Sequence, residues 1–332
     1  MYSLSVMMLT AALIVGVSVC LIPNVIWFLW WAIAEMFHFS TPRYAPFAWT
    51  AAGLVAAVWL IMAYGFFVGR FRLEVKPTTY TNAQLPEAFK GYKIVHISDL
   101  HLSTYDDRSA ALQRIVDSIN AQQPDLICFT GDLVTIGVSE ANPYTDILRQ
   151  LHATDGVVSV LGNHDMLIYT HLSEQRRLAE VEHLADYERT QLGWHLLRNE
   201  HLTIERNGQH INIIGVDNCS CEGEGFRTIY AGDLQKAKAG ADGFSILLSH
   251  DPSHWRAEVL NTDIPLTLSG HTHSGQMRIF SWAASSVSFK ESAGWYEQNG
   301  HSLYVNSGIG CTLPVRLNCP SEITVITLQQ QP

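Results

Sequence analysis

The stretch Ser269–Gln276, SGHTHSGQ, directly follows the apolar run Ile264–Leu268, IPLTL. If that run is a strand, its side chains alternate between two faces, so His271 and His273 project to the same side where the strand ends. Two neighbouring imidazoles suggest a metal site. The chain has 15 histidines, so a chance pair at this spacing is not improbable. A metal site therefore requires further ligands at comparable positions.

Such ligands follow four other apolar runs in the sequence. Taken alone, each has an ordinary explanation as a turn residue or a helix cap. Together, in order and each behind an apolar run, they are hard to assign to chance. Ligands at the ends of strands converge on one edge of a sheet, where α/β enzymes place their sites. These residues are Asp99, His101, Asp132, Asn163, His164 and His250.

The same part of the chain alternates between strand and helix patterns, which predicts an α/β domain with mixed sheets. The segment 108–123 has helical spacing of its apolar residues, and a second helix is expected around 173–191. Strands are expected at 92–98, 125–131, 157–161, 211–216, 245–248, 266–268, 302–305 and 323–327.

The first 70 residues have a different composition, with Glu35, Arg43 and Arg70 as their only charges. Leu4–Ala34 and Pro46–Val68 are almost wholly apolar, and each is long enough to cross a hydrocarbon core of about 30 Å. A cleaved signal peptide is disfavoured because no basic segment precedes the apolar run and no small-residue cleavage site follows it. The length of both runs disfavours a buried hairpin of a soluble protein. The sequence therefore predicts two transmembrane helices.

Three segments follow from this composition: a membrane anchor at 1–70, a polar linker at 71–90, and a globular domain at 91–332. Arg70, Arg72 and Lys76 flank the end of the second span, whereas the connecting loop has Arg43 alone. This asymmetry predicts a multi-pass protein of the inner (cytoplasmic) membrane with its globular domain facing the cytoplasm. The net charge of −10 argues against a nucleic-acid binder, which needs a basic face.

The six cysteines show no disulfide framework and agree with a reducing compartment. Cys219-Ser-Cys221 has the form of half a zinc site, but no second pair has matching spacing. Structural zinc normally takes four ligands, so free thiols are favoured at these positions.

The ordered set D-x-H, G-D, G-N-H-D, H and G-H-T-H, spread from Tyr92 to Leu328, resembles the calcineurin-like metallophosphoesterase family. The ending YVNSGIGCTLPVRLNCPSEITVITL, with ILLSHDP and LSGHTHSGQ, is similar to a membrane-associated bacterial branch of that family. The resemblance implies a β-sandwich of mixed sheets flanked by helices, here preceded by two transmembrane helices. It also implies a hydrolase that acts on phosphoric ester bonds.

The resemblance further implies a dinuclear centre of two divalent ions, Mn, Fe or Zn, that activates water for attack on phosphorus. A carboxylate can bridge two cations through its two oxygens, whereas an imidazole nitrogen offers one lone pair to one ion. The implied ligands are Asp99, His101 and His273 for one ion, Asn163, His250 and His271 for the other, and Asp132 for both.

The resemblance implies catalytic roles for His164 and Asp165. His164 would face the substrate and stabilise the phosphoryl group or protonate the leaving oxygen, and Asp165 would orient its ring. The alternative is that His164 only caps a helix. Ser274 departs from the pattern, because this branch commonly has glycine there, and a serine is expected to fit with a negative backbone φ.

The resemblance favours a phosphodiesterase or pyrophosphatase, and membrane attachment favours a lipid-linked substrate. The alternatives are a phosphomonoesterase and a non-catalytic metal-binding membrane scaffold, against which the intact His164 argues. Two further groups have open interpretations. The first is a set of basic residues that either hold a second phosphate or are solvated surface charges, namely Arg278, Lys290 and Arg316. The second is a set of aromatic residues that either form an apolar wall facing the bilayer or pack beneath a loop, namely Trp282, Phe289, Trp295 and Tyr296.

Overall fold

The computed structural model of the protein describes residues 4–105, 108–220 and 232–330. The chain divides into two compact units. The first contains Met1–Arg70 together with Leu313–Leu317, and the second contains Phe71–Thr312 and Asn318–Pro332.

The first unit contains a hairpin of two long helices, α1 (Leu4–Met36) and α2 (Ala45–Phe67). The indole of Trp59 on α2 donates a hydrogen bond to the carbonyl oxygen of Ala12 on α1, at 3.0 Å. The most apolar windows of the two helices have mean hydropathies of 2.5 and 2.1, and only 11% and 17% of those windows are buried. A core helix of a soluble protein would bury such a surface, so these helices have the length, composition and exposure of membrane-spanning segments.

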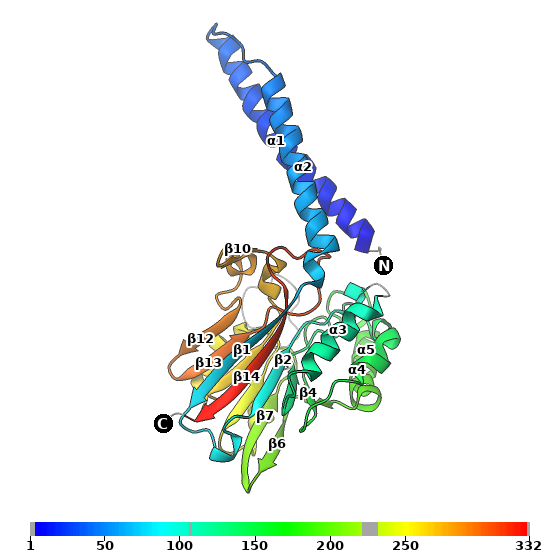
Figure 1. The fold of residues 1–332 in the computed structure, drawn as a ribbon, viewed down its shortest axis with the longest axis vertical. Helices are drawn as coiled ribbons and strands as arrows, with labels where there is room; N and C mark the ends of the chain where they lie inside the picture. Colours follow the sequence, from blue (N-terminus) through cyan, green and yellow to red (C-terminus); the bar gives the residue numbers. More distant parts are fainter. Residues whose placement is uncertain (1–3, 106–107, 221–231, 331–332) are drawn as a thin grey trace. The chain divides into compact units, whose positions relative to one another are not determined.

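The second unit is built on two six-stranded sheets (Figure 1). Both sheets are mixed, because each contains parallel and antiparallel pairs. In spatial order, the first sheet contains β1 (Leu73–Asn82), β14 (Ser321–Gln330), β2 (Lys93–Ile97), β3 (Leu126–Phe129), β4 (Val157–Ser159) and β5 (His195–Leu196). The second contains β12 (Gly294–Gln298), β13 (His301–Val305), β9 (Leu266–Ser269), β8 (Ser245–Leu248), β7 (Gln209–Gly215) and β6 (Glu200–Arg206).

The two sheets pack face to face over a shared apolar core. Ile94 and Cys128 of the first sheet lie in the same buried cluster as Ile213, Leu248 and Leu268 of the second. Side chains along a strand point alternately to the two faces of its sheet, so the other buried residues of each sheet face away from this core and must be covered by a further layer. The domain is therefore layered, with helices outside both sheets.

Helices supply that cover. Figure 1 shows α3 (Ser109–Asn120), α4 (Thr145–Leu148) and α5 (Glu174–Asp186) grouped beside the first sheet. The buried side chains of α3 recur with helical spacing at Leu112, Ile115, Val116 and Ile119 and join the core of that sheet. The outer face of the second sheet is covered by the short helices α6 (Leu234–Lys238) and α7 (Ser253–Ala257). The α/β sandwich of mixed sheets flanked by helices is confirmed.

The segment 71–90, predicted to be a linker, contains a strand in the structure. Its residues 73–82 form the edge strand β1, which pairs in parallel with β14 over its whole length. The strand pattern is weak because only Tyr80 is buried, and Pro77 is tolerated because an edge strand pairs on one side only. The globular unit therefore begins at Phe71, next to the end of the predicted anchor.

The order of the strands decides where the predicted ligands meet. β2, β3 and β4 are parallel neighbours in the first sheet, and β8 and β9 are parallel neighbours in the second. The carboxyl ends of parallel neighbours share one edge of a sheet, so the loops that follow these five strands lie together. The predicted ligands all lie in those loops.

Candidate metal centre

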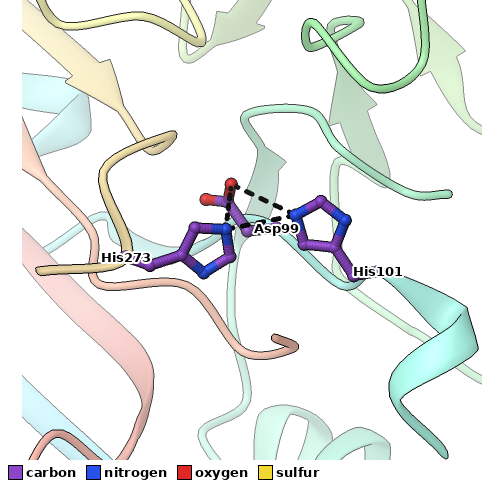
Figure 2. Close-up of side chains that lie close together, drawn as sticks. All are labelled: Asp99, His101 and His273. Carbon is purple, nitrogen blue, oxygen red and sulfur yellow. Dashed lines mark hydrogen bonds and ion pairs between the residues drawn. The ribbon is translucent and has the colours of Figure 1, made fainter. Parts of the chain in front are cut away.

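The first group of ligand atoms contains Asp99, His101 and His273 (Figure 2). The Nε2 atoms of His101 and His273 lie 3.1 Å apart. Asp99 Oδ1 lies 3.2 Å from His273 Nε2 and 3.9 Å from His101 Nε2. All three side chains are buried, and Figure 2 shows their ligand atoms turned toward one another.

The second group contains Asn163, His250 and His271. Asn163 Oδ1 lies 2.9 Å from His250 Nε2 and 2.8 Å from His271 Nδ1. The two imidazole nitrogens are 3.2 Å apart. The group combines an amide from the first sheet with two histidines from the second, so it exists only when the sheets are packed together.

Asp132 lies between the two groups. Its Oδ2 is 3.5 Å from His101 Nε2 and 3.2 Å from His250 Nε2. Its Oδ1 accepts a hydrogen bond from the backbone N–H of His164 at 2.8 Å. This is the position that a carboxylate shared by two ions would occupy.

The nitrogen and oxygen atoms of these side chains are suited to bind cations. His250 Nδ1 donates to the carbonyl oxygen of Thr130 at 2.7 Å, which leaves Nε2 facing the oxygens of Asp132 and Asn163. Nε2 can face those oxygens only when it carries a proton or when a cation lies between them. Asp99 Oδ1 is also buried and accepts no hydrogen bond within the part of the chain that the structure describes, although His273 Nε2 lies nearby. Buried polar atoms arranged in this way are typical of a metal site.

Electrostatics support the same interpretation. Burial alone would raise the pKa of Asp99, but the neighbouring histidines His273, His250 and His101 hold it well below its usual range. Burial opposes a charge on His250, yet Asp132 and Asp99 outweigh that effect and raise the pKa of His250 to about 10. Burial lowers the pKa of His101 well below its usual range. The centre therefore holds ionised carboxylates that stabilise positive charge.

The backbone at the centre is strained. A positive φ is uncommon for residues other than glycine, and such strain clusters at functional sites. The loops are held in place by short backbone contacts: Asp99 N–H donates to the carbonyl oxygen of Gly131 at 2.8 Å, and a Cβ on Gly162 would collide with the side chain of Asp132. Five of the predicted metal ligands have φ between 38° and 72°: Asp99, His101, Asp132, His271 and His273.

His164 borders the centre: one of its ring nitrogens lies within 4.8 Å of ligand atoms of His101 and Asp132, but the residue belongs to neither of the two groups above. Its Nδ1 donates to the carbonyl oxygen of Thr135 at 2.9 Å, so its Nε2 is available to a substrate. Its ring lies 4.8 Å from that of His101 and 4.6 Å from that of Tyr169, measured between centroids. The side chain is partly exposed, as expected for a residue that meets a substrate.

Asp165 does not take the orienting role predicted for it, because Thr135 supplies the contact to the His164 ring. Its carboxylate instead accepts hydrogen bonds from the backbone N–H groups of Asp132, Gly162 and Val134, at 2.6, 3.0 and 3.1 Å. Burial and the nearby charge of Asp132 raise the pKa of Asp165 to about 7. Asp165 therefore joins the loops after β3 and β4 and positions the metal ligands.

The expectation of a negative φ at Ser274 is wrong, since its φ is 53°. Hydrogen bonds accompany this strained conformation. The Ser274 hydroxyl lies 2.8 Å from that of Ser307, and it accepts a hydrogen bond from the Arg278 guanidinium at 2.9 Å.

The remaining basic residues do not gather at the centre as one group. Arg278 contacts Ser274 and Ser307, Lys290 is exposed, and Arg316 is fully buried and belongs to the first unit. Arg316 has no exposed surface, so in this structure its guanidinium is not accessible to a substrate phosphate.

The four aromatic residues also separate. Phe289 packs edge-on against the metal-ligand candidate His271, with ring centroids 5.3 Å apart, and Trp282 is 45% exposed. Trp295 packs against Tyr80 and Tyr304 inside the sheet domain. Tyr296 accepts a hydrogen bond from the backbone N–H of Ser292. Of the four, Phe289 therefore remains as an apolar side chain at the site, and Trp282 as an exposed aromatic residue.

Two residues of the site carried no sequence signal. Thr135 orients His164, and its hydroxyl lies 3.4 Å from His101 Nδ1. The Tyr169 hydroxyl accepts a hydrogen bond from the side-chain amide of Asn163 at 2.9 Å, which aims the Asn163 oxygen at the histidines. Thr135 acts through its backbone, and Tyr169 lies beyond the recognisable G-N-H-D motif.

The family model described as calcineurin-like phosphoesterase matches residues 92–275. The chain is 32% identical over 296 residues to the uncharacterized metallophosphoesterase YkuE of Bacillus subtilis (strain 168), covering 83% of this chain and 94% of that protein. It is 34% identical over 262 residues to a Danio rerio transmembrane protein with metallophosphoesterase domain, covering 74% of this chain. The match spans about half of that relative, 55% of its length.

Proposed function

The chain belongs to the calcineurin-like phosphoesterase family, a family of hydrolases that act on phosphoester bonds, and we propose that its substrate is a lipid-linked phosphodiester or pyrophosphate. The observation that carries this proposal is the convergence of buried carboxylate, amide and imidazole ligands beside the accessible ring of His164. Apolar side chains beside that centre and the two long apolar helices support the lipid-linked part.

The ligands divide between two divalent ions, each Mn, Fe or Zn. Asp99, His101 and His273 would hold one, Asn163, His250 and His271 the other, and Asp132 both. When bound, such ions lower the pKa of a water molecule and offset negative charge on a phosphoryl group. The protein's own contribution is to hold these ligands in place, through Asp165 and the backbone contacts of the strand-end loops.

His164 is the proposed general acid. The hydrogen bond from Nδ1 to Thr135 fixes the ring, so that in the protonated imidazole Nε2–H can donate to the oxygen of the departing group. Histidine suits this role because it exchanges a proton near neutral pH. A scaffold that only binds metal would not need this residue.

Apolar side chains beside the centre suit a substrate with an apolar group. Tyr169 is 38% exposed and lies against the ring of His164, while Phe289 lies against His271. Ile136, directly after the Thr135 that orients His164, is 44% exposed. A small phosphate ester would leave these surfaces in water, whereas a lipid would cover them.

The substrate proposal is tested with the full-length protein in detergent. We expect faster hydrolysis of bis-p-nitrophenyl phosphate than of p-nitrophenyl phosphate, with Mn²⁺, Zn²⁺ or Mg²⁺ supplied. We also expect mass spectrometry of a bacterial lipid extract to show loss of a phosphodiester or pyrophosphate lipid after exposure to the enzyme. Preference for the monoester with no change in any lipid would favour a phosphomonoesterase, and hydrolysis of neither ester would favour a scaffold.

The orientation in the membrane follows from charge. Arg70, Arg72 and Lys76 after the second span outnumber Arg43 between the spans, which supports a globular domain on the cytoplasmic face of the inner membrane. Protease added to sealed inside-out vesicles should digest this domain, and protease added to right-side-out vesicles should leave it intact. The reverse pattern of digestion would overturn the proposed orientation.

A further inference from the structure

A second kind of ligand cluster lies outside the dinuclear centre. Cys219 follows β7, His254 lies in α7, and Glu258 directly follows that helix. One ligand atom from each of the three residues lies within 4.8 Å of the other two. Cys219 and His254 are each 1% exposed, whereas the Glu258 side chain is 49% exposed and opens the cluster to solvent.

The His254 ring is held in the orientation that a ligand needs. Its Nδ1 lies 2.9 Å from the buried Ser249 hydroxyl, a partner of the kind that fixes metal-binding histidines. Its other nitrogen, Nε2, lies 3.5 Å from Glu258 Oε2, one helical turn along the chain. Burial lowers the pKa of His254, which favours the neutral imidazole that binds metal.

The spacing agrees with one small cation. Zinc bonds of about 2.0 to 2.3 Å in a tetrahedron place ligand atoms about 3.3 to 3.8 Å apart. The 3.5 Å between His254 Nε2 and Glu258 Oε2 falls in this range, and the distances to Cys219, which lie within 4.8 Å, need a contraction of at most about 1 Å. A buried cysteine alone would be explained as a small apolar residue, and a His–Glu pair alone as a surface ion pair. Neither explanation accounts for a thiol, an imidazole and a carboxylate that meet at one point.

We propose that Cys219, His254 and Glu258 bind a third divalent ion, of the zinc class, with water in the remaining position. A thiolate with an imidazole selects zinc or a similar borderline metal over Mg²⁺ or Mn²⁺. The ion would tie the segment after β7 to α7. That helix begins three residues after His250, so the ion would also steady the loop that carries this ligand of the dinuclear centre.

Cobalt substitution tests the third site separately from the catalytic one. The proposed dinuclear centre contains no sulfur ligand, so a thiolate-to-cobalt charge-transfer band in the near ultraviolet reports the Cys219 site alone. We expect full-length protein loaded with Co²⁺ to show this band and to bind three equivalents of metal. Cys219→Ser should lose the band and one equivalent, and it should keep ester hydrolysis.

Two further variants make the test decisive. Glu258→Gln changes a half-exposed carboxylate with little risk to folding and should weaken Co²⁺ binding at this site by about tenfold or more. Cys311→Ser, which alters another buried cysteine, is the matched control and should keep the band and all three equivalents. Absence of the band in the wild-type protein, or its persistence in Cys219→Ser, would overturn the third site. Neither result would bear on the dinuclear centre.

Discussion

Replacing Asp132 with asparagine should reduce hydrolysis of a phosphodiester by about 10³-fold or more, because a shared ligand contributes several kcal/mol to transition-state stabilisation. Asp132 Oδ2 lies within 3.5 Å of a histidine from each ligand group, so its loss weakens both ion sites together. Asparagine keeps an oxygen to accept the hydrogen bond from His164 N–H, so the loop should remain folded. Elemental analysis should find that the variant has lost more than one equivalent of metal relative to the wild-type protein.

The control for this variant is Asp146→Asn, which makes the same chemical change at a side chain that is 95% exposed. It should keep full activity and metal content. Circular dichroism of both variants checks that the fold is retained. If Asp132→Asn binds two ions at that centre and hydrolyses the diester normally, Asp132 is not a shared ligand.

Replacing His164 with alanine should slow hydrolysis of an unactivated alkyl phosphodiester by about 10²- to 10⁴-fold, the usual contribution of a general acid. The metal content should stay at the wild-type value, since His164 belongs to neither three-ligand group. The loss should be smaller for bis-p-nitrophenyl phosphate, whose leaving group departs without a proton. Steady-state kinetics on the two esters measures this difference.

The matched control is His183→Ala, which removes a histidine whose side chain is 65% exposed. It should hydrolyse both esters at the wild-type rate. An equal loss on both esters in His164→Ala, accompanied by loss of metal, would show that His164 supports the metal centre instead of donating a proton.

The local pattern of apolar residues was enough to predict the elements that carry the site. The runs that became β2, β3, β8 and β9 are short, buried and bounded by glycine or charged residues, so they have few alternatives to a central strand. The two long apolar helices were also predicted, because their runs without charges are long and continuous.

The strand β1 was not predicted because its residues show no regular local pattern. Its threonines and Pro77 give no regular alternation, and it becomes a strand because β14, some 250 positions later in the chain, offers a free edge for pairing. The role of Asp165 was also missed, because its partners are backbone N–H groups that every sequence contains.

By itself, the sequence determined the chemical types of the ligands and their positions behind apolar strands, because short-range periodicity defines a strand and its end. Tertiary structure decided which ligands share a centre, since His101 and His273 meet across 172 positions through sheet packing. It also decided the positive φ of the ligand residues, the pairing of His164 with Thr135, and the meeting of Cys219 with His254. These features depend on how distant loops are packed against one another, and no local pattern of residue types encodes that packing.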